Sequence, residues 1–198
     1  MKKLFPVLEY ASVPNIITTL GLCFGITACV YLVEGNLKAV LICLALATLM
    51  DLIDGFFAVR LKKETQFGKY ADSLVDFFIC CIMPVFMLKT FVGTSIYIII
   101  SSGFYCVCGL WRLANYNVEA SAKKQTHFTG LPVPAAMLCV SMAIFAIVNY
   151  GVPDWSSSIV LCLTGLMMIS SFKLKKYGLA QKILCVVWLI FFIVVLIV

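Results

Sequence analysis

Residues 37–60 read LKAVLICLALATLMDLIDGFFAVR, an apolar run that ends in two aspartates, a glycine and an arginine. A helix needs about 20 predominantly apolar residues to cross the hydrocarbon core of a bilayer. The segment is long and apolar enough for such a crossing, and Asp51 and Asp54 fall near one of its ends. The stretch therefore predicts a membrane-spanning helix with polar side chains close to one membrane surface.

The whole chain has the composition of an integral membrane protein. Of its 198 residues 63% are hydrophobic and 12% are charged, and the mean hydropathy is +1.09. A soluble domain is usually about 45–50% apolar and about 25% charged. The composition excludes a disordered chain, a secreted disulfide scaffold and a nucleic-acid binder.

Apolar runs of spanning length recur along the chain, joined by short connections. Residues 1–10 lack the pattern of a cleavable signal peptide. We expect one membrane domain over 1–198, all-α, with about six core helices and a C-terminal apolar helix. The predicted spans are 14–33, 37–60, 70–92, 94–117, 131–150, 155–172 and 180–198.

The distribution of positive charge predicts the orientation of these spans, because cytoplasmic loops are enriched in lysine and arginine. With the N-terminus in the cytoplasm, only Lys38 and Lys89 of the 15 basic residues fall on the other side. The connections 61–69 and 118–130, which carry most of the polar residues between spans, then also face the cytoplasm. We therefore expect a plasma-membrane protein whose chemistry lies at the cytoplasmic surface.

The ten cysteines lie inside apolar runs, and the single histidine, His127, has no cysteine near it in sequence. No pair has the C-x2-C spacing of a structural zinc site. We expect free thiols that pack as small apolar side chains.

Four of the five aspartates fall in one short stretch, residues 51–76. Asp51 and Asp54 are three residues apart near the end of the second span, and Asp72 and Asp76 are four apart near the start of the third. Both spacings place a pair on one helix face. Two consecutive helices joined by a short loop run antiparallel, so the two acidic faces can meet at one depth.

Carboxylates gathered in a partly desolvated site cannot all remain ionised unless cations are present. Oxygen ligands without cysteine or histidine favour Mg²⁺, Mn²⁺ or Ca²⁺. Two such ions would suit the transfer of a phosphoryl-type group. The alternative is a set of interfacial salt bridges to Arg60, Lys62, Lys63 and Lys69, although exposed bridges contribute little stability.

The acidic stretch resembles the signature of the CDP-alcohol phosphotransferase family, D-x2-D-G-x2-A-R followed after a short spacer by G-x3-D-x3-D. The arginine that follows the alanine in the family is Val59 here, and Arg60 comes one residue later. The matching residues are Asp51, Asp54, Gly55, Ala58, Gly68, Asp72 and Asp76.

Four other segments narrow the resemblance to the phosphatidylserine synthase subgroup, over about residues 13–173. Two residues depart from the pattern. Gly21 stands where the family often has asparagine, and Asn115 stands where the subgroup has arginine. The segments are VPNIIT at 13–18, WRLANYN at 111–117, FTGLPVPAA at 128–136 and SFK at 171–173.

The resemblance implies a helical bundle, usually a homodimer, that transfers a phosphatidyl group from CDP-diacylglycerol to L-serine and releases CMP. Its other members use acceptors such as glycerol phosphate, inositol or inositol phosphate. Two divalent cations, Mg²⁺ or Mn²⁺, would be held by Asp51, Asp54, Asp72 and Asp76. The resemblance further makes Asp76 the general base and assigns the nucleotide site to Asp51, Gly55, Ala58 and Gly68.

Weaker candidates for binding phosphate or serine are Arg60, Arg112, Asn15 and Thr18, and among them Arg112 offers a planar fork for anions. Lys123, Lys124, Lys173 and His127 are weaker again. Two readings of other classes stay open. The first is a cation transporter with the aspartates in its path, and the second is a family member that binds metal without turnover.

Overall fold

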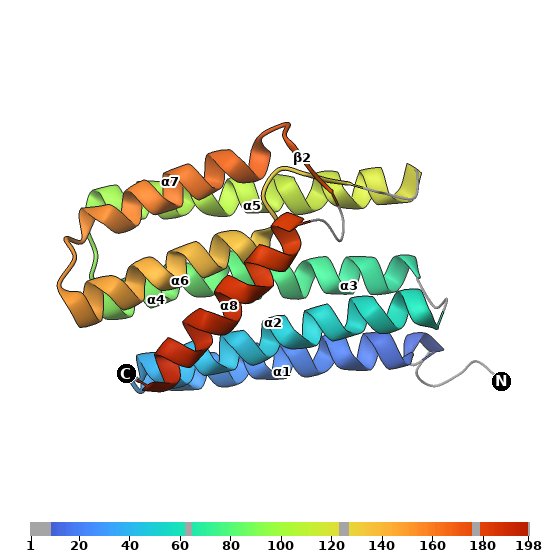
Figure 1. Cartoon of the computed structure of the whole chain (residues 1–198), viewed down its shortest axis with the longest axis horizontal. Helices are drawn as coiled ribbons and strands as arrows, with labels where there is room; N and C mark the ends of the chain where they lie inside the picture. The colour runs from blue at the N-terminus through green and yellow to red at the C-terminus, as the bar shows by residue number, and fades with distance from the viewer. Residues whose placement is uncertain (1–8, 62–64, 123–126, 176–178, 198) are drawn as a thin grey trace.

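The computed structural model describes residues 9–61, 65–122, 127–175 and 179–197, and almost all of this part of the chain is helical (Figure 1). The helices are α1 (Val13–Val33), α2 (Leu37–Arg60), α3 (Gln66–Asp76), η2 (Phe77–Ile82), α4 (Met83–Phe91), α5 (Ile96–Ala122), α6 (Val133–Tyr150), α7 (Trp155–Ile169) and α8 (Leu179–Ile197). Two short strands are also present, β1 (His127–Thr129) and β2 (Lys173–Lys175).

Every predicted span corresponds to helix, which confirms the helical membrane fold. Five helical segments are long and apolar enough to cross a bilayer, and the third of them, 66–91, joins α3, η2 and α4 without a break. Helix α7 is shorter, at 15 residues, and the apolar part of α8 is shorter still. The chain is an integral membrane protein.

Several predicted boundaries were wrong, and the third span shows the physical reason. It begins at Gln66 rather than at residue 70, because Thr65 caps the helix by accepting a hydrogen bond from the N–H of Gly68 at 3.0 Å. Part of the predicted 61–69 loop is therefore the first turn of α3. Helix α5 likewise continues five residues beyond the expected end at 117.

The strand pair was not expected from the sequence. Strands β1 and β2 pair in antiparallel register, with Phe128 opposite Leu174 and Thr129 opposite Lys173. The pairing takes up the segments that precede α6 and follow α7, so two stretches far apart in sequence lie side by side. Helix α7 consequently ends at Ile169, three residues short of the predicted boundary.

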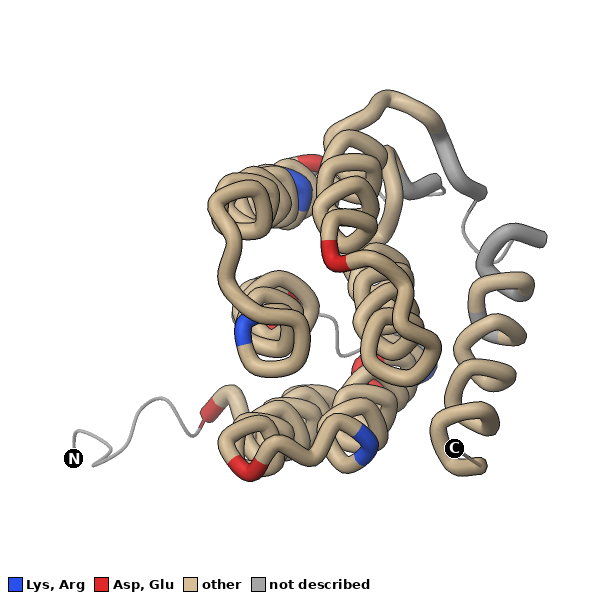
Figure 2. Tube along the Cα trace, turned by 90° about the vertical axis from the view of Figure 1, so that its left-hand side faces the viewer, with Lys and Arg blue, Asp and Glu red and all other residues tan. Residues whose placement is uncertain are grey.

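The long helices run antiparallel to their neighbours in sequence, and α8 lies obliquely across the outside of the bundle (Figures 1 and 2). Helix α1 packs closely along α2, and α5 along α7. Glycines permit both contacts, since small residues let helix backbones approach. A Cβ at Gly21 would lie 3.4 Å from the Cβ of Met50, and one at Gly165 would lie 3.0 Å from the Phe104 ring.

The core is apolar and contains sulfur side chains as predicted. Met83, Met87 and Cys81 are buried in it, and the nine cysteines whose side chains are described are free thiols. Many large apolar side chains, such as those of Leu163 and Leu189, point outward. Outward apolar surface is expected where the surrounding solvent is lipid.

Charged residues are sparse at the end of the bundle formed by the α1–α2, α4–α5 and α6–α7 connections, which Figure 2 views head-on. The charged residues close to these connections are Glu34, Lys38, Lys89 and Asp154, all exposed. The Nζ of Lys38 donates to the carbonyl of Leu196 at 2.8 Å and so serves the last turn of α8. We call this the sparse end, and the other, where α2 ends and α3 begins, the carboxylate end.

Candidate active site

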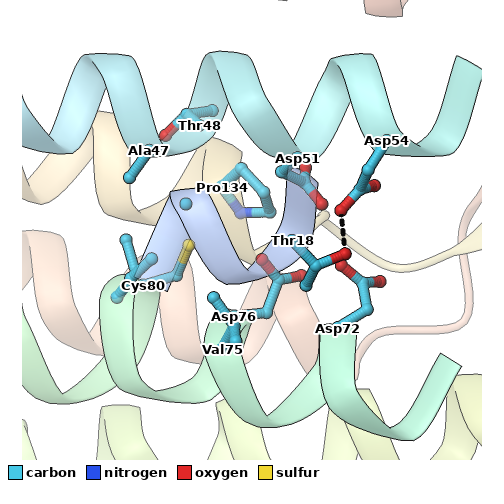
Figure 3. Close-up of a pocket in the computed structure, with 12 residues that line it drawn as sticks. Thr18, Ala47, Thr48, Asp51, Asp54, Asp72, Val75, Asp76, Cys80 and Pro134 are labelled. Atoms are coloured by element: carbon cyan, nitrogen blue, oxygen red, sulfur yellow. Dashed lines mark hydrogen bonds between the residues drawn. The ribbon is translucent and has the colours of Figure 1, made fainter. Parts of the chain in front are cut away.

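Four aspartates converge where α2 and α3 run past each other near the carboxylate end (Figure 3). Asp51 and Asp54 come from α2, and Asp72 and Asp76 come from α3. Asp51, Asp72 and Asp76 each place one carboxylate oxygen so that these atoms lie within 4.8 Å of one another. The predicted meeting of the two acidic helix faces is therefore present in the fold.

The aspartates line a small cavity between α1, α2, η2 and α3, with room for about one water molecule. Its deeper wall is apolar and is closed by Pro134 at the start of α6. Pro134 belongs to the 128–136 segment, so that segment reaches the cavity. The lining residues are Thr18, Gly21, Ala47, Thr48, Asp51, Asp54, Asp72, Val75, Asp76, Ile79, Cys80 and Pro134.

Asp54 lies beside the group of three rather than within it. Its carboxylate accepts a hydrogen bond from the Thr18 hydroxyl of α1, and both side chains are buried. Thr18 Oγ1 also lies 3.1 Å from the carbonyl oxygen of Pro14, one helical turn back. Thr18, a candidate for substrate binding in the sequence analysis, therefore orients Asp54 in this structure.

Among the described residues, none of the four aspartates forms an ion pair with a lysine or arginine. The Arg60 guanidinium instead lies over the Phe56 ring, at 5.7 Å from its centroid. Lys62 and Lys63 lie outside the described residues. Salt bridges to the basic residues that the structure describes therefore do not account for the aspartates.

Among the described residues, Arg112 of α5 is a basic side chain whose charge acts on the site. It is 7% exposed, and its charge attracts that of Asp76. Its guanidinium lies over the Tyr116 ring at 5.6 Å, while its buried Nε has no hydrogen-bond partner among the described residues. A buried unsatisfied donor is costly, so Arg112 is suited to receive an anionic group.

Polar side chains of α5 reach both α3 and the strand pair. Asn117 Nδ2 donates to the Ser73 hydroxyl at 2.9 Å, next to Asp72 in sequence. Glu119 accepts from Asn115 at 2.9 Å and from the Thr129 hydroxyl at 3.4 Å. The end of α5 thus ties β1 to the bundle beside the site.

Two motif glycines, Gly55 and Gly68, occupy different surroundings. A Cβ at Gly68 would lie 2.7 Å from Asn15 Oδ1, so this glycine permits contact between α1 and α3. Asn15 is held there because its Nδ2 donates to the Tyr10 carbonyl at 2.7 Å. A Cβ at Gly55 would meet nothing within 4 Å.

Several predicted residues lie outside the cavity. Asn15 and Gly68 contact each other at its rim, while Gly55, Ala58 and Arg60 follow Asp54 toward the exposed end of α2. Lys123 and Lys124 lie outside the described residues, and for His127 and Lys173 the structure describes only the backbone, in the strand pair.

Sequence reasoning did not single out several residues of the cavity wall. Thr48 precedes Asp51 by three residues and Cys80 follows Asp76 by four, so helical periodicity would have placed both on the acidic faces. Gly21 was noted only as a departure, yet it lies in the wall opposite Ala47 and Met50.

The donor set fits a divalent cation. Three carboxylates on two rigid helices supply oxygen ligands close together, and hard divalent ions prefer such ligands. In a partly buried site, carboxylates at this separation repel one another strongly without a cation. This part of the chain could therefore bind a metal ion.

Comparison with known proteins agrees with the geometry. The sequence model of the family described as CDP-alcohol phosphatidyltransferase matches residues 11–171, which include all four aspartates and Arg112. That range also covers the predicted resemblance from residue 13 almost to its end.

The chain is also similar, at low sequence identity, to several named enzymes. A CDP-diacylglycerol–serine O-phosphatidyltransferase of Mycobacterium leprae is 29% identical over 173 residues, 82% of this chain and 58% of its own length. An archaetidylserine synthase of Methanothermobacter thermautotrophicus is 28% identical, covering 86% of this chain and 72% of its own. A CDP-diacylglycerol–serine O-phosphatidyltransferase of Methanocaldococcus jannaschii is 27% identical, covering 89% of this chain and 77% of its own length.

Proposed function

The chain belongs to the CDP-alcohol phosphatidyltransferase family, and on that premise we propose that it transfers a phosphatidyl group from CDP-diacylglycerol to L-serine, with release of CMP. The observation that carries the proposal is the trio of carboxylates from α2 and α3 within 4.8 Å of one another. The names of three relatives, each a serine-type synthase, support serine as the acceptor. The Mycobacterium leprae relative is the longer protein, since this chain spans 58% of its length.

The acidic group would hold two divalent cations, Mg²⁺ or Mn²⁺. The ligands would be Asp51, Asp72 and Asp76. Asp54 would lie beside them, oriented by the hydrogen bond that it accepts from Thr18. Bound there, the ions would offset the negative charge of the pyrophosphate and of the leaving CMP. Ca²⁺ shares the preference for oxygen ligands but tolerates looser geometry.

Asp76 would act as the general base that takes the proton of the serine hydroxyl. Asp76 lies in the cavity wall beside Asp51 and Asp72, and its charge is attracted by that of Arg112. A carboxylate in this position can hold the proton while the hydroxyl oxygen attacks phosphorus. The bond from phosphorus to the CMP oxygen breaks as the new phosphate ester forms.

Arg112 would bind an anionic group of a substrate, either the serine carboxylate or the lipid phosphate. Its burial and its unsatisfied Nε favour this role over contact with the membrane surface. A guanidinium binds carboxylate and phosphate oxygens with two parallel hydrogen bonds.

The nucleotide would approach along the end of α2. The backbone at Gly55 is open, with no atom where a side chain would begin, and Ala58 lies one turn further on. Glycine lets a ligand come close to the main chain. The family resemblance assigns Gly68 to the nucleotide site. Gly68 would act there indirectly, because it leaves the space that the Asn15 side chain occupies.

We further propose that the chain lies in the plasma membrane with its carboxylate end on the cytoplasmic side. Lys38 and Lys89, the basic residues expected on the far side, lie near the sparse end, and Arg60, Lys69 and Arg112 lie toward the other. This distribution agrees with the enrichment of basic residues in cytoplasmic connections. Fusion of reporters to the 34–36 and 61–65 connections would test it.

The activity is tested with the purified full chain in lipid nanodiscs, supplied with CDP-diacylglycerol, Mn²⁺ or Mg²⁺, and a panel of acceptor alcohols. We expect CMP release with L-serine and background rates with glycerol phosphate, inositol or inositol phosphate. CMP release with another acceptor but not with serine would overturn serine as the proposed acceptor. Absence of CMP release with every acceptor would refute the proposed transferase activity. The mass of the protein in detergent, corrected for the bound detergent, would test the homodimer that the family resemblance implies.

A further inference from the structure

The third span contains a wide helical turn directly after the last aspartate of the site. Helix α3 ends at Asp76, and the next six residues, Phe77–Ile82, form the π-helix η2 before α4 begins. The N–H of Met83 donates to the carbonyl of Phe78, five residues back rather than four. Such turns are rare, and they often lie at functional sites.

Pro84 gives the physical reason for this turn. In a regular α-helix residue 84 would donate its N–H to the carbonyl of Cys80, but proline has no N–H and its ring clashes with that carbonyl. The Cys80 carbonyl is consequently left without its usual partner inside the hydrocarbon region. A backbone carbonyl in such a place must be satisfied by another element.

Tyr105 of α5 supplies the missing donor. Its hydroxyl donates to the Cys80 carbonyl at 2.8 Å, and its side chain is 0% exposed. The thiol of Cys106 makes a second, weaker bond to the Cys81 carbonyl at 3.4 Å. Gly109, one turn further along α5, leaves the space that the Cys81 Sγ occupies.

The wide turn fixes how the two aspartates of α3 face the cavity. Each residue of an α-helix advances by about 100° around the axis, and a π-turn takes up roughly one residue more than an α-turn. If η2 reverted to regular α-helix, α3 would rotate relative to α4 by up to one such step. Asp72 and Asp76 would then turn relative to α4, which packs against α1 and α6, and so relative to Asp51 on α2.

We infer that Tyr105 is a positioning residue for the active site: its hydroxyl holds the π-turn open at Cys80, and the turn directs Asp72 and Asp76 toward Asp51. Tyr105 itself does not line the cavity. The inference rests on the proposed cation site, because it concerns the alignment of that site's ligands.

The test compares Mn²⁺ binding to the full-length protein and to Tyr105→Phe in nanodiscs without substrate, by the electron paramagnetic resonance signal of free Mn²⁺. The variant removes one hydroxyl and keeps the ring. We expect its Mn²⁺ dissociation constant to rise by about 3- to 10-fold, which corresponds to the free energy of one neutral hydrogen bond. The Mn²⁺ concentration for half-maximal CMP release should rise equally, with the KM for L-serine unchanged.

Ser101→Ala is the matched control. It also removes a buried hydroxyl from α5, but that hydroxyl bonds within α5, to the Ile98 carbonyl at 3.2 Å. Its Mn²⁺ affinity should match that of the unmodified protein, because no contact with η2 is lost. If Tyr105→Phe does not fold, Cys106→Ala tests the same turn with an expected rise of about twofold.

The outcomes separate the two proposals. Unchanged Mn²⁺ affinity in folded Tyr105→Phe, with metal binding and CMP release intact in the unmodified protein, would overturn the positioning role alone. An equal loss of affinity in Ser101→Ala would also overturn it, because the effect would then be general to α5. Absence of Mn²⁺ binding in the unmodified protein would instead refute the proposed cation site.

Discussion

The two ends of the bundle both carry charged side chains, but in opposite ways. At the sparse end Glu34, Lys38, Lys89 and Asp154 are exposed, at or near the helix ends. At the carboxylate end Asp51, Asp72 and Asp76 point toward one another within the bundle. Asp54 lies beside them, bonded to Thr18, and is only 6% exposed.

The difference shows that the position of a carboxylate, rather than the number of charges, marks the site. An exposed charge is solvated by water and needs no partner. A carboxylate within a helix bundle must instead be neutralised or bind a cation. Each variant at the carboxylate end is compared with a matched one: a residue of the sparse end for the aspartates, and a nearby residue in different surroundings for the glycines and threonines.

The largest contrast should come from Asp76→Asn against Glu34→Gln. The first removes the proposed base, so CMP release from CDP-diacylglycerol and L-serine should fall by about 10²- to 10⁴-fold. The second removes an exposed carboxylate at the sparse end and should leave the rate within about twofold. Comparable rates for Asp76→Asn and the unmodified protein would rule out Asp76 as the base.

Metal dependence should separate Asp72→Asn from Asp154→Asn. Chelation with EDTA should abolish turnover in the unmodified protein, and added Mn²⁺ or Mg²⁺ should restore it. Asp72→Asn should need about 10- to 100-fold more Mn²⁺ for half-maximal rate, because one charged ligand is gone. Asp154→Asn should titrate like the unmodified protein. Full activity in EDTA would contradict a cation-dependent reaction.

The two glycines of the motif should fail in different ways when replaced by alanine. Gly55→Ala adds a methyl group to open space, so thermal stability should hold while the KM for CDP-diacylglycerol rises by about 3- to 10-fold. Gly68→Ala pushes against Asn15 and should cost about 1–3 kcal/mol of stability. Thermal unfolding and steady-state kinetics on both variants measure this. A destabilised Gly55→Ala with normal KM would remove the evidence for an open nucleotide path.

The smallest contrast should lie between Thr18→Val and Thr19→Val. Thr18 donates to the buried Asp54 carboxylate, so its loss should cost about 1–3 kcal/mol. The exposed Thr19 bonds only to the Asn15 carbonyl of its own helix at 2.8 Å, and its loss should change stability by about 0.5 kcal/mol or less. Thermal unfolding in the same nanodiscs compares the two variants. Equal midpoints would show that Thr18 does not stabilise Asp54.

The fold was largely predictable, because apolar length decides where helices cross a membrane. Every predicted span is helical, and the spacing of Asp51, Asp54, Asp72 and Asp76 correctly placed two acidic faces opposite each other. The short strand pair was not predictable in the same way, since its two strands come from segments about 45 residues apart and pair only because α6 and α7 bring them together.

The sequence by itself determined the helices, the acidic faces and the family, because periodicity, apolar length and motif spacing are local properties of the chain. Only the tertiary structure decided that Asp54 turns to Thr18, that Gly68 serves Asn15, and that Tyr105 bonds to the carbonyl that Pro84 leaves without a donor. Each of these contacts joins residues from different helices. Such pairs depend on how the helices are rotated against one another, and local sequence patterns do not specify that rotation.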